Sequence, residues 1–338
     1  FSQFKGPLSV IDIPIPAPTN DGVVIKVEAT GLCRSDWHAW MGHDPDIVLP
    51  HVPGHEFAGV ISAIGSSVSK YSIGDRVTVP FVSGCGKCGY CLRGDAQVCP
   101  TQTQPGFTGY GSFAEYVAIN NADFNLVKIP EALSFATAAA LGCRFATAYR
   151  GLIKRAHLTA NEKVVIYGCG GVGLSAIMIA KAKGAIVYAV DINDAALKIA
   201  ESLGAETINS SKIDPIAYLQ NLGGADVSVD ALGSKATAGA SVLSLARRGR
   251  HLQLGLLITP NGLSEIPMAR VIAWEIDLLG SHGMSARDYP EMLALVATGV
   301  LNPAVLVKRE VGLAEGAKAL AELDSNSLGG ITIIKPNK

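Results

Sequence analysis

A glycine-rich turn between an apolar strand and a helix constrains the fold of this 338-residue chain more than any other feature. An apolar run at 164–167 leads into Gly168-Cys169-Gly170-Gly171-Val172-Gly173, and apolar residues with helical spacing follow at 172–183. In this G-x-G-x-x-G pattern the first glycine permits a tight turn, the second lets the backbone approach a pyrophosphate, and the third lets the helix pack closely on the strand. Amides at the start of the helix suit phosphate oxygens. The turn therefore predicts a dinucleotide-binding site.

The residue that ends the next expected strand, Asp191, indicates which dinucleotide binds. It lies about 20 residues beyond the glycines, where a carboxylate accepts hydrogen bonds from ribose hydroxyls and repels a 2′-phosphate. Ile192 and Asn193 follow it and offer no arginine for such a phosphate. We therefore expect NAD(H) rather than NADP(H).

Around this turn the chain alternates between short apolar strands and helical segments. Further strands are expected at 186–190, 206–209, 227–231, 252–256 and 278–280. Repeated β-α-β units with continuously apolar strands predict a doubly wound parallel sheet. The first third instead has the texture of β-structure, with strands expected at 23–27, 59–64 and 76–79, and a last strand is expected at 331–334. We expect an α/β chain in which a cofactor domain, 147–286, is inserted between two segments of a β-rich domain, 1–146 and 287–338.

Four of the seven cysteines form the sharpest local pattern, Cys85-x2-Cys88-x2-Cys91-x7-Cys99. Four thiolates this close in sequence can surround one tetrahedral Zn²⁺ and leave no position open for chemistry. Two disulfides are an alternative that the lack of a secretion signal disfavours. A [4Fe–4S] cluster is another, since Pro100 follows Cys99 as in bacterial ferredoxins, but those have a shorter last spacing and a second set of cysteines. The spacing favours structural zinc.

A second group of metal-binding residue types is spread along the chain. Cys33 follows an expected strand, His55 lies in Pro53-Gly54-His55-Glu56, and Cys143 precedes the cofactor domain. One histidine and two cysteines make a three-ligand zinc site with a fourth position for water or substrate. Each residue also has an ordinary structural interpretation, since a free cysteine is often a small buried hydrophobe. The residues alone do not bring these three together.

Composition excludes several classes of protein. The formal net charge is −1, and no stripe of lysine or arginine marks a nucleic-acid binder. Hydrophobic residues make up 49% of the chain and charged residues 17%, which excludes disorder. The longest uncharged, mainly apolar run, 164–180, is short for a membrane helix. The opening residues carry no basic segment followed by an apolar one, so we expect a cytoplasmic protein. Because no Met starts the chain, a few residues are expected to precede it.

Together these motifs resemble the zinc-dependent medium-chain alcohol dehydrogenases. The resemblance covers essentially the whole chain and rests on segments in the family's order: Gly31-Leu32-Cys33-Arg34-Ser35-Asp36-Trp37-His38, Gly54-His55-Glu56, the four-cysteine loop, Gly142-Cys143, the glycine-rich turn and Asp191. It implies a GroES-like β-rich catalytic domain, a Rossmann cofactor domain, and an NAD(H)-dependent alcohol dehydrogenase with two Zn²⁺ per chain. The expected partner is a small alcohol or carbonyl substrate, without nucleic acid or membrane. A homo-oligomer is expected, a homotetramer rather than a dimer.

The resemblance also implies a role for individual residues. Catalytic zinc would be bound by Cys33, His55 and Cys143, and structural zinc by Cys85, Cys88, Cys91 and Cys99. Asp36 would orient His55, and Glu56 would approach or transiently bind the metal. Arg34 would contact the cofactor pyrophosphate, and Thr147 and Val172 would pack on the nicotinamide side. Ser35 would accept the alcohol proton and pass it on to His38, whose ordinary pKa of about 6.5 suits exchange with solvent.

Substrate and cofactor binding carry two further expectations. Trp40 and Phe81 are expected to shape an apolar pocket, which favours small aliphatic or aromatic alcohols. A polyol or amino-alcohol dehydrogenase is the alternative, although such relatives often carry glutamate in place of Cys143, and a non-catalytic metal- or nucleotide-binding protein is a more remote one. Relatives often have an arginine before the last strand, whereas Leu328-Gly329-Gly330-Ile331 has none. Cofactor binding would then depend more on Arg34 and on backbone amides.

Overall fold

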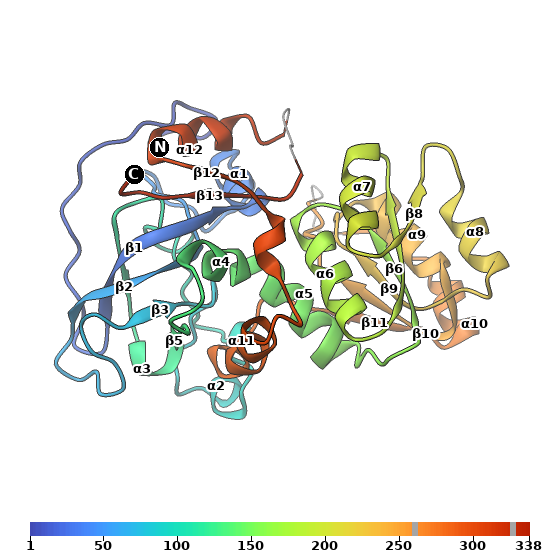
Figure 1. Ribbon diagram of the computed structural model, residues 1–338, viewed down its shortest axis with the longest axis horizontal. Helices are drawn as coiled ribbons and strands as arrows, with labels where there is room; N and C mark the ends of the chain where they lie inside the picture. Colours follow the sequence, from blue (N-terminus) through green and yellow to red (C-terminus); the bar gives the residue numbers. More distant parts are fainter. Residues whose placement is uncertain (259–262, 325–328) are drawn as a thin grey trace. The chain divides into compact units, whose positions relative to one another are not determined.

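The computed structural model describes residues 1–258, 263–324 and 329–338, and the chain divides into two compact units (Figure 1). Unit 1 comprises Phe1–Ala146 and Gly283–Lys338, and unit 2 comprises Thr147–His282. From the sequence we expect the inserted domain to end at residue 286. Unit 2 ends slightly earlier, at His282. Leu328, which opens the arginine-free segment before the last strand, lies outside the described residues. Within the described ranges no helix is both long and apolar enough to cross a membrane.

Unit 1 is built on a seven-stranded sheet in which β1 is the hub. The strand order is β12-β13-β1-β2-β3-β5, and β4 also pairs with β1. All pairings are antiparallel except that of β12 with β13. The strands are β1 (Val23–Leu32), β2 (Glu56–Ile64), β3 (Arg76–Thr78), β4 (Tyr116–Ile119), β5 (Val127–Lys128), β12 (Val307–Val311) and β13 (Ile331–Ile334). The last strand of the chain thus completes a sheet that the first strand begins.

The core of unit 1 is formed by β-branched and aromatic side chains that favour strands. Ile25, Phe57, Val77 and Val117 come from four different strands and are buried together. Short helices surround this sheet: α1 (Arg34–Trp40), α2 (Gly89–Arg93), η1 (Ala96–Val98), α3 (Ala122–Asn125), α4 (Phe135–Ala140), η2 (Leu141–Phe145), η4 (Ala286–Asp288), α11 (Tyr289–Ala297), η5 (Pro303–Leu306) and α12 (Leu313–Ala321).

Unit 2 has a six-stranded, all-parallel sheet in the order β11-β10-β9-β6-β7-β8. Its strands are β6 (Lys163–Tyr167), β7 (Ile186–Asp191), β8 (Glu206–Asn209), β9 (Ala225–Asp230), β10 (Leu245–Gln253) and β11 (Asp277–Gly280). Its helices are α5 (Ala146–Arg150, whose first residue belongs to unit 1), η3 (Gly151–Arg155), α6 (Gly171–Ala182), α7 (Asp194–Ser202), α8 (Pro215–Asn221), α9 (Lys235–Leu243) and α10 (Met268–Trp274). The order reverses at β6, and such a switch point is where doubly wound sheets bind ligands. The predicted doubly wound sheet is confirmed.

The strand expected at 252–256 is misplaced. Strand β10 runs from Leu245 to Gln253, and its pairing with β9 is interrupted between Leu245 and Arg250. Arg248, inside this irregularity, has a positive φ of 61°. The strand carries arginines at 247, 248 and 250, so it lacks the apolar run by which buried strands are predicted. In a bulged segment polar and apolar side chains need not alternate.

Phe57 provides a test of the unit 1 core, because its side chain is only 1% exposed among the apolar residues of β1, β3 and β4. Replacement by alanine leaves a cavity and removes buried apolar surface, so Phe57→Ala is expected to lower the free energy of unfolding by about 3–5 kcal/mol. Urea denaturation followed by circular dichroism measures this change. Ile73→Ala is the matched control, since Ile73 is 64% exposed and its loss should change stability by less than about 0.5 kcal/mol.

Candidate active site and metal centres

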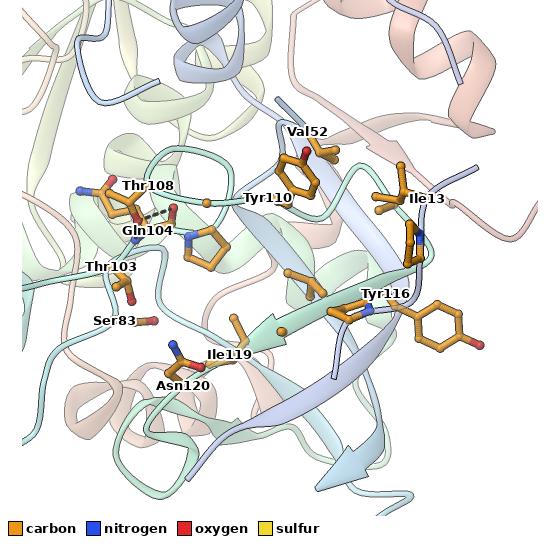
Figure 2. A pocket seen from close by; sticks show the side chains of 18 residues that line it. Ile13, Val52, Ser83, Thr103, Gln104, Thr108, Tyr110, Tyr116, Ile119 and Asn120 are labelled. Carbon is orange, nitrogen blue, oxygen red and sulfur yellow. Dashed lines mark hydrogen bonds between the residues drawn. The ribbon is translucent and has the colours of Figure 1, made fainter. Parts of the chain in front are cut away.

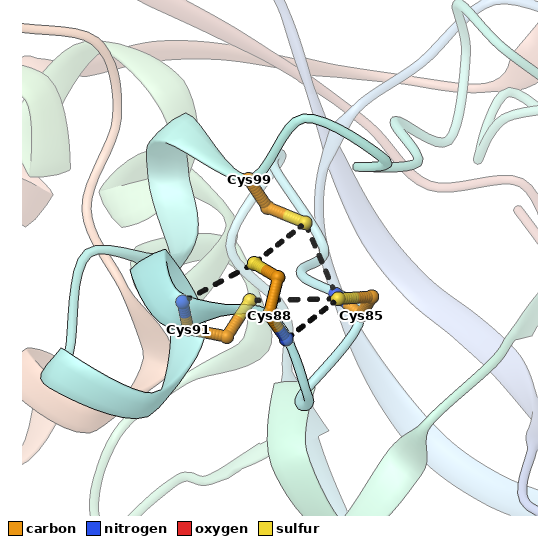
Figure 3. Close-up of side chains that lie close together, drawn as sticks. All are labelled: Cys85, Cys88, Cys91 and Cys99. Carbon is orange, nitrogen blue, oxygen red and sulfur yellow. Dashed lines mark hydrogen bonds between the residues drawn. The ribbon is translucent and has the colours of Figure 1, made fainter.

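The four cysteines of the loop at 85–99 converge on one point (Figure 3). The Sγ atoms of Cys85 and Cys91 are 4.0 Å apart, and those of Cys88 and Cys99 are 3.8 Å apart. A tetrahedral ion with Zn–S bonds of about 2.3 Å requires sulfur–sulfur distances of about 3.8 Å. All four cysteines are free, and these separations far exceed the disulfide bond length of about 2.05 Å. An iron–sulfur cube, in which each iron takes one cysteine, needs its sulfurs farther apart. The geometry fits a single tetrahedral ion.

Backbone amides prepare these sulfurs for a cation. The amides of Cys88 and Cys91 donate to the Sγ atoms of Cys85 and Cys88, and the amide of Cys85 donates to that of Cys99. Hydrogen bonds to a thiolate stabilise its charge. The backbone amide of Lys87 lowers the pKa of Cys85 to about 6, whereas burial raises that of Cys91 to about 12.

The structure also brings together the three separated residues Cys33, His55 and Cys143. Their ligand atoms and a carboxylate oxygen of Glu56 all lie within 4.8 Å of one another. Strands β1 and β2 are antiparallel neighbours with Gly31 opposite Glu56, so Cys33, just after β1, and His55, just before β2, meet at one end of the sheet. Gly142, with φ −59° and ψ −110°, interrupts the helical backbone next to Cys143. The described residues therefore form a second candidate metal site, in which Cys33, His55 and Glu56 are buried and Cys143 is partly exposed.

Asp36 positions His55. The buried Asp36 Oδ1 accepts a hydrogen bond from His55 Nδ1 at 2.9 Å and one from the amide of Gly54 at 3.0 Å. Because a carboxylate only accepts, Nδ1 donates to Asp36, which leaves Nε2 as the ring nitrogen available to a metal. His55 Nε2 is buried and has no hydrogen-bond partner among the described residues. A buried polar nitrogen normally has a hydrogen-bond partner, and a metal ion would supply one here. Two thiols lie beside this nitrogen, so the residues fit a metal.

The two sulfurs of this site are electrostatically coupled. A hydrogen bond from Cys143 lowers the pKa of the Cys33 thiol well below its usual range, and the same contact raises the pKa of Cys143. The contact therefore favours the charged form of Cys33 and the protonated form of Cys143. A divalent cation stabilises both thiolates, which is how metal binding displaces protons.

Glu56 is held by a residue that the sequence analysis did not single out. Its Oε1 accepts hydrogen bonds from the backbone amide and Nε of Arg144 at 2.9 and 3.1 Å, and its Oε2 accepts one from Arg144 Nη2. Burial raises the pKa of Glu56, and the Arg144 guanidinium opposes that shift. An arginine inside the apolar segment Leu141-Gly142-Cys143-Arg144-Phe145 was the available signal, since a buried arginine needs an acidic partner.

Other expected residues lie around this centre. Ser35 Oγ is 3.8 Å from the Sγ of Cys33. The Phe81 ring lies against the His55 imidazole with ring centroids 6.0 Å apart, and Phe107, which the sequence analysis missed, is closer at 5.0 Å. Trp40 instead donates its indole N–H to the carbonyl of Gly6 at 2.9 Å, which ties down the opening segment.

Arg34 and His38, both on α1, have partners of their own. Arg34 Nη1 is 2.6 Å from Asp324 Oδ1, and its guanidinium lies over the Trp37 ring. His38 Nδ1 is 3.0 Å from His43 Nδ1. Burial, together with the neighbouring His43 and Arg34, lowers the pKa of His38 to about 4. The expectation that His38 titrates near neutrality is therefore wrong, because a half-buried imidazole beside other cationic groups resists protonation.

The glycine-rich turn of unit 2 has the expected backbone. Gly168 has a φ of +94°, and a Cβ on Gly173 would lie 1.7 Å from the Gly168 carbonyl oxygen. Gly170 is the N-cap residue of α6, and no side chain caps the helix there. A Cβ placed on Gly170 would have no neighbouring atom within 4 Å. Asp191 Oδ2 accepts a hydrogen bond from the amide of Cys169 at 2.7 Å, so Asp191 also holds the turn.

The remaining cofactor residues are on two helices of unit 2. Gly171 and Val172 begin α6, where backbone amides remain available to an anion. Thr147 is buried in α5.

A cavity of about 380 Å³ lies elsewhere in unit 1 (Figure 2). Ile13, Tyr110, Tyr116 and Asn120 are among its lining residues. The Ser83 hydroxyl also lines it and, among the described residues, has no hydrogen-bond partner. The residues around this cavity include none of those expected in the active site, as far as the structure describes them.

Comparison with known proteins defines the family. The family descriptions "Alcohol dehydrogenase GroES-like domain" and "Zinc-binding dehydrogenase" match residues 19–131 and 171–298. An alcohol dehydrogenase of Geobacillus stearothermophilus is 36% identical over 310 residues, covering 90% of each chain. An NAD-dependent alcohol dehydrogenase of Sulfurisphaera tokodaii is 33% identical over 345 residues, covering 98% of this chain and 97% of its own. The structure of an alcohol dehydrogenase from Thermus sp. ATN1 matches with a TM-score of 0.90 and 28% identity, covering 99% of this chain and 98% of that one.

The chain therefore belongs to the zinc-dependent medium-chain alcohol dehydrogenase family. The expected combination of a GroES-like and a Rossmann-type domain is confirmed by these matches and by the two sheets.

The lowered pKa of His38 predicts how stability changes with pH. Between its ordinary pKa of 6.5 and about 4 the unfolded chain binds a proton at His38 and the folded chain does not. Protons then favour unfolding, so the free energy of unfolding falls as the pH drops through this window. His38→Gln removes this contribution, and the variant is expected to lose less stability than the parent between pH 6.5 and pH 4.

Urea denaturation at several pH values measures this difference. His157→Asn is the matched control, because His157 is exposed and asparagine tolerates its positive φ of 50°. Parallel stability curves for His38→Gln and the parent would contradict the assignment.

Proposed function

We propose that this protein is an NAD(H)-dependent alcohol dehydrogenase that interconverts small primary or secondary alcohols and their aldehydes or ketones. The supporting observation is the cluster of Cys33, His55 and Cys143, in which the buried Nε2 of His55 has no partner among the described residues. We propose one zinc there and one at Cys85, Cys88, Cys91 and Cys99. Zinc at a three-ligand site supplies Lewis-acid activation of an alcohol oxygen, and NAD(H) supplies the hydride chemistry.

The residues of this chain supply binding, orientation and proton movement. Asp36 fixes the tautomer of His55, and Phe81 and Phe107 cover its ring with apolar surface that excludes water. Ser35, beside Cys33, is placed to take the alcohol proton at Oγ. His38 is proposed to follow Ser35 in the relay, and because its pKa is lowered to about 4 it would pass the proton on to solvent rather than hold it. His43 holds its Nδ1.

The cofactor site is proposed on unit 2. Amides of Gly170, Gly171 and Val172 would receive the pyrophosphate at the start of α6, and Asp191 would accept hydrogen bonds from the ribose. Thr147 and Val172 are proposed to pack on the nicotinamide. Phe81 would contact substrate, and Trp40 is retained as a pocket residue only through the family resemblance.

Assembly and compartment complete the proposal. Strand β11 is an edge of the sheet in unit 2, and its Leu278 is 42% exposed. An open edge of this kind favours pairing with another copy, which supports a homo-oligomer, for which we propose a tetramer. Seven free cysteines, four of them at metal-binding spacing, support a reducing compartment such as the cytoplasm.

Cys143→Ala tests the catalytic site. The folded variant is expected to retain about one zinc per chain instead of about two, and to lose NAD-dependent oxidation of 1-propanol and benzyl alcohol by at least about 100-fold. Zinc is counted by plasma mass spectrometry, and NADH formation is followed at 340 nm. Cys169→Ala is the control, because this buried cysteine lies outside both clusters and its loss should leave the zinc content at about two. Full zinc content and activity in Cys143→Ala would refute the proposed ligand set.

Asp324→Asn tests whether Arg34 binds the cofactor pyrophosphate. Asp324 now pairs with Arg34 at 2.6 Å, and removing its charge frees the guanidinium for phosphate. An exposed ion pair contributes about 0.2–1 kcal/mol, so the KM for NAD is expected to fall by up to about fivefold. Arg34→Gln should raise the same KM in parallel steady-state assays. If neither substitution changes the KM for NAD, Arg34 is not a cofactor ligand.

A further inference from the structure

A buried ion pair adjoins the candidate catalytic metal site and has no place in the function proposed so far. Glu56 is fully buried, and Arg144 is 6% exposed. The arginine grips both carboxylate oxygens, with its Nε and backbone amide on Oε1 and its Nη2 on Oε2. Such a two-point contact fixes a carboxylate in direction as well as in position.

Glu56 is close enough to become a metal ligand itself. One of its oxygens lies within 4.8 Å of the ligand atoms of Cys33, His55 and Cys143. Carboxylate oxygen is a common zinc ligand, and a site with four protein ligands is closed to substrate. The same carboxylate can therefore bind either the guanidinium or the metal. In the first arrangement the fourth coordination position of the metal stays open to substrate, and in the second Glu56 occupies it.

The charges of the site explain why the guanidinium is needed. Two thiolates and a divalent ion sum to zero, and so do Glu56 and Arg144. Without the arginine, Glu56 would be a buried charge with the metal as the nearest cation. A buried charge that loses its partner is strongly unfavourable, so the carboxylate would turn to the metal.

The surrounding backbone leaves space for this pair. A Cβ on Gly31 would lie 2.6 Å from Glu56 Oε2 and 2.9 Å from Arg144 Nη2. A Cβ on Gly142 would lie 2.7 Å from Glu56 Cβ. Any larger residue at either position would push the carboxylate or the guanidinium out of place.

We propose that Arg144 is a positioning residue that holds Glu56 off the catalytic metal and so keeps the fourth coordination position open. This inference rests on the proposed function, because it presupposes a metal at Cys33, His55 and Cys143. It makes the residue next to a metal ligand responsible for access of substrate to that metal.

The test measures the open position directly, without turnover. The catalytic zinc is exchanged for Co²⁺, and imidazole is titrated against the visible cobalt spectrum as a probe of the free position. Arg144→Met is expected to weaken imidazole binding at least about tenfold and to shift the cobalt bands, as Glu56 becomes a ligand. The double variant Arg144→Met/Glu56→Gln should bind imidazole to within about threefold of the parent, because a neutral amide is a poor zinc ligand. The double variant thus also controls for the loss of the arginine, because it leaves neither buried charge without its partner.

Two results would overturn the inference. One is an Arg144→Met protein that binds imidazole as the parent does, and the other is a double variant as impaired as the single one. If Arg144→Met does not fold, Arg144→Lys takes its place, since lysine keeps the charge but not the two-point contact. It should weaken imidazole binding at least about threefold, and unchanged binding would overturn the inference. A parent protein that takes up only one metal per chain would instead refute the proposed function.

Discussion

Three N–H groups converge on the carboxylate of Asp36, and the candidate active site depends on this convergence. Asp36 accepts from the amide of Cys33, the amide of Gly54 and Nδ1 of His55, all within 3.0 Å. It thus ties the start of α1 to the end of the loop that leads into β2. The register of β1 and β2 brings the two backbones to the same end of the sheet, and Asp36 decides which way the sulfur-bearing turn and the imidazole face. A fully buried carboxylate is tolerable only because every one of these donors satisfies it.

The same principle governs the second buried acid. Glu56 follows His55 directly, and one of its carboxylate oxygens lies within 4.8 Å of the ligand atoms of the metal site. Its charge is matched by Arg144, which follows Cys143 and so enters from the η2 segment. Tyr289 of α11 is a third buried polar group near this centre, and burial, with Cys143 and Glu56 nearby, raises its pKa. The buried polar groups around the candidate metal site therefore come from both segments of unit 1, which are far apart in sequence.

Sequence patterns predicted the features that are local. The glycine-rich turn and the four-cysteine loop each lie within a short stretch, so spacing alone indicates what their residues can do together. The grouping of Cys33, His55 and Cys143 came only through a family resemblance, because spacing carries no information about residues that meet through a sheet. Strand β10 was misplaced because a bulge and its arginines disguise the strand. Arg144 was missed because its acidic partner lies 88 positions earlier in the chain.

The sequence by itself determined the alternation of strands and helices, the glycine-rich turn and the four donors of the loop at 85–99, because these follow from residue type and short-range spacing. Only the tertiary structure decided the protonation behaviour of His38 and the capture of Arg34 by Asp324. It alone also showed that Glu56 faces the Arg144 guanidinium. These outcomes depend on burial and on charges brought in from distant segments, and a pKa or an ion pair is a property of that assembled environment rather than of the residue.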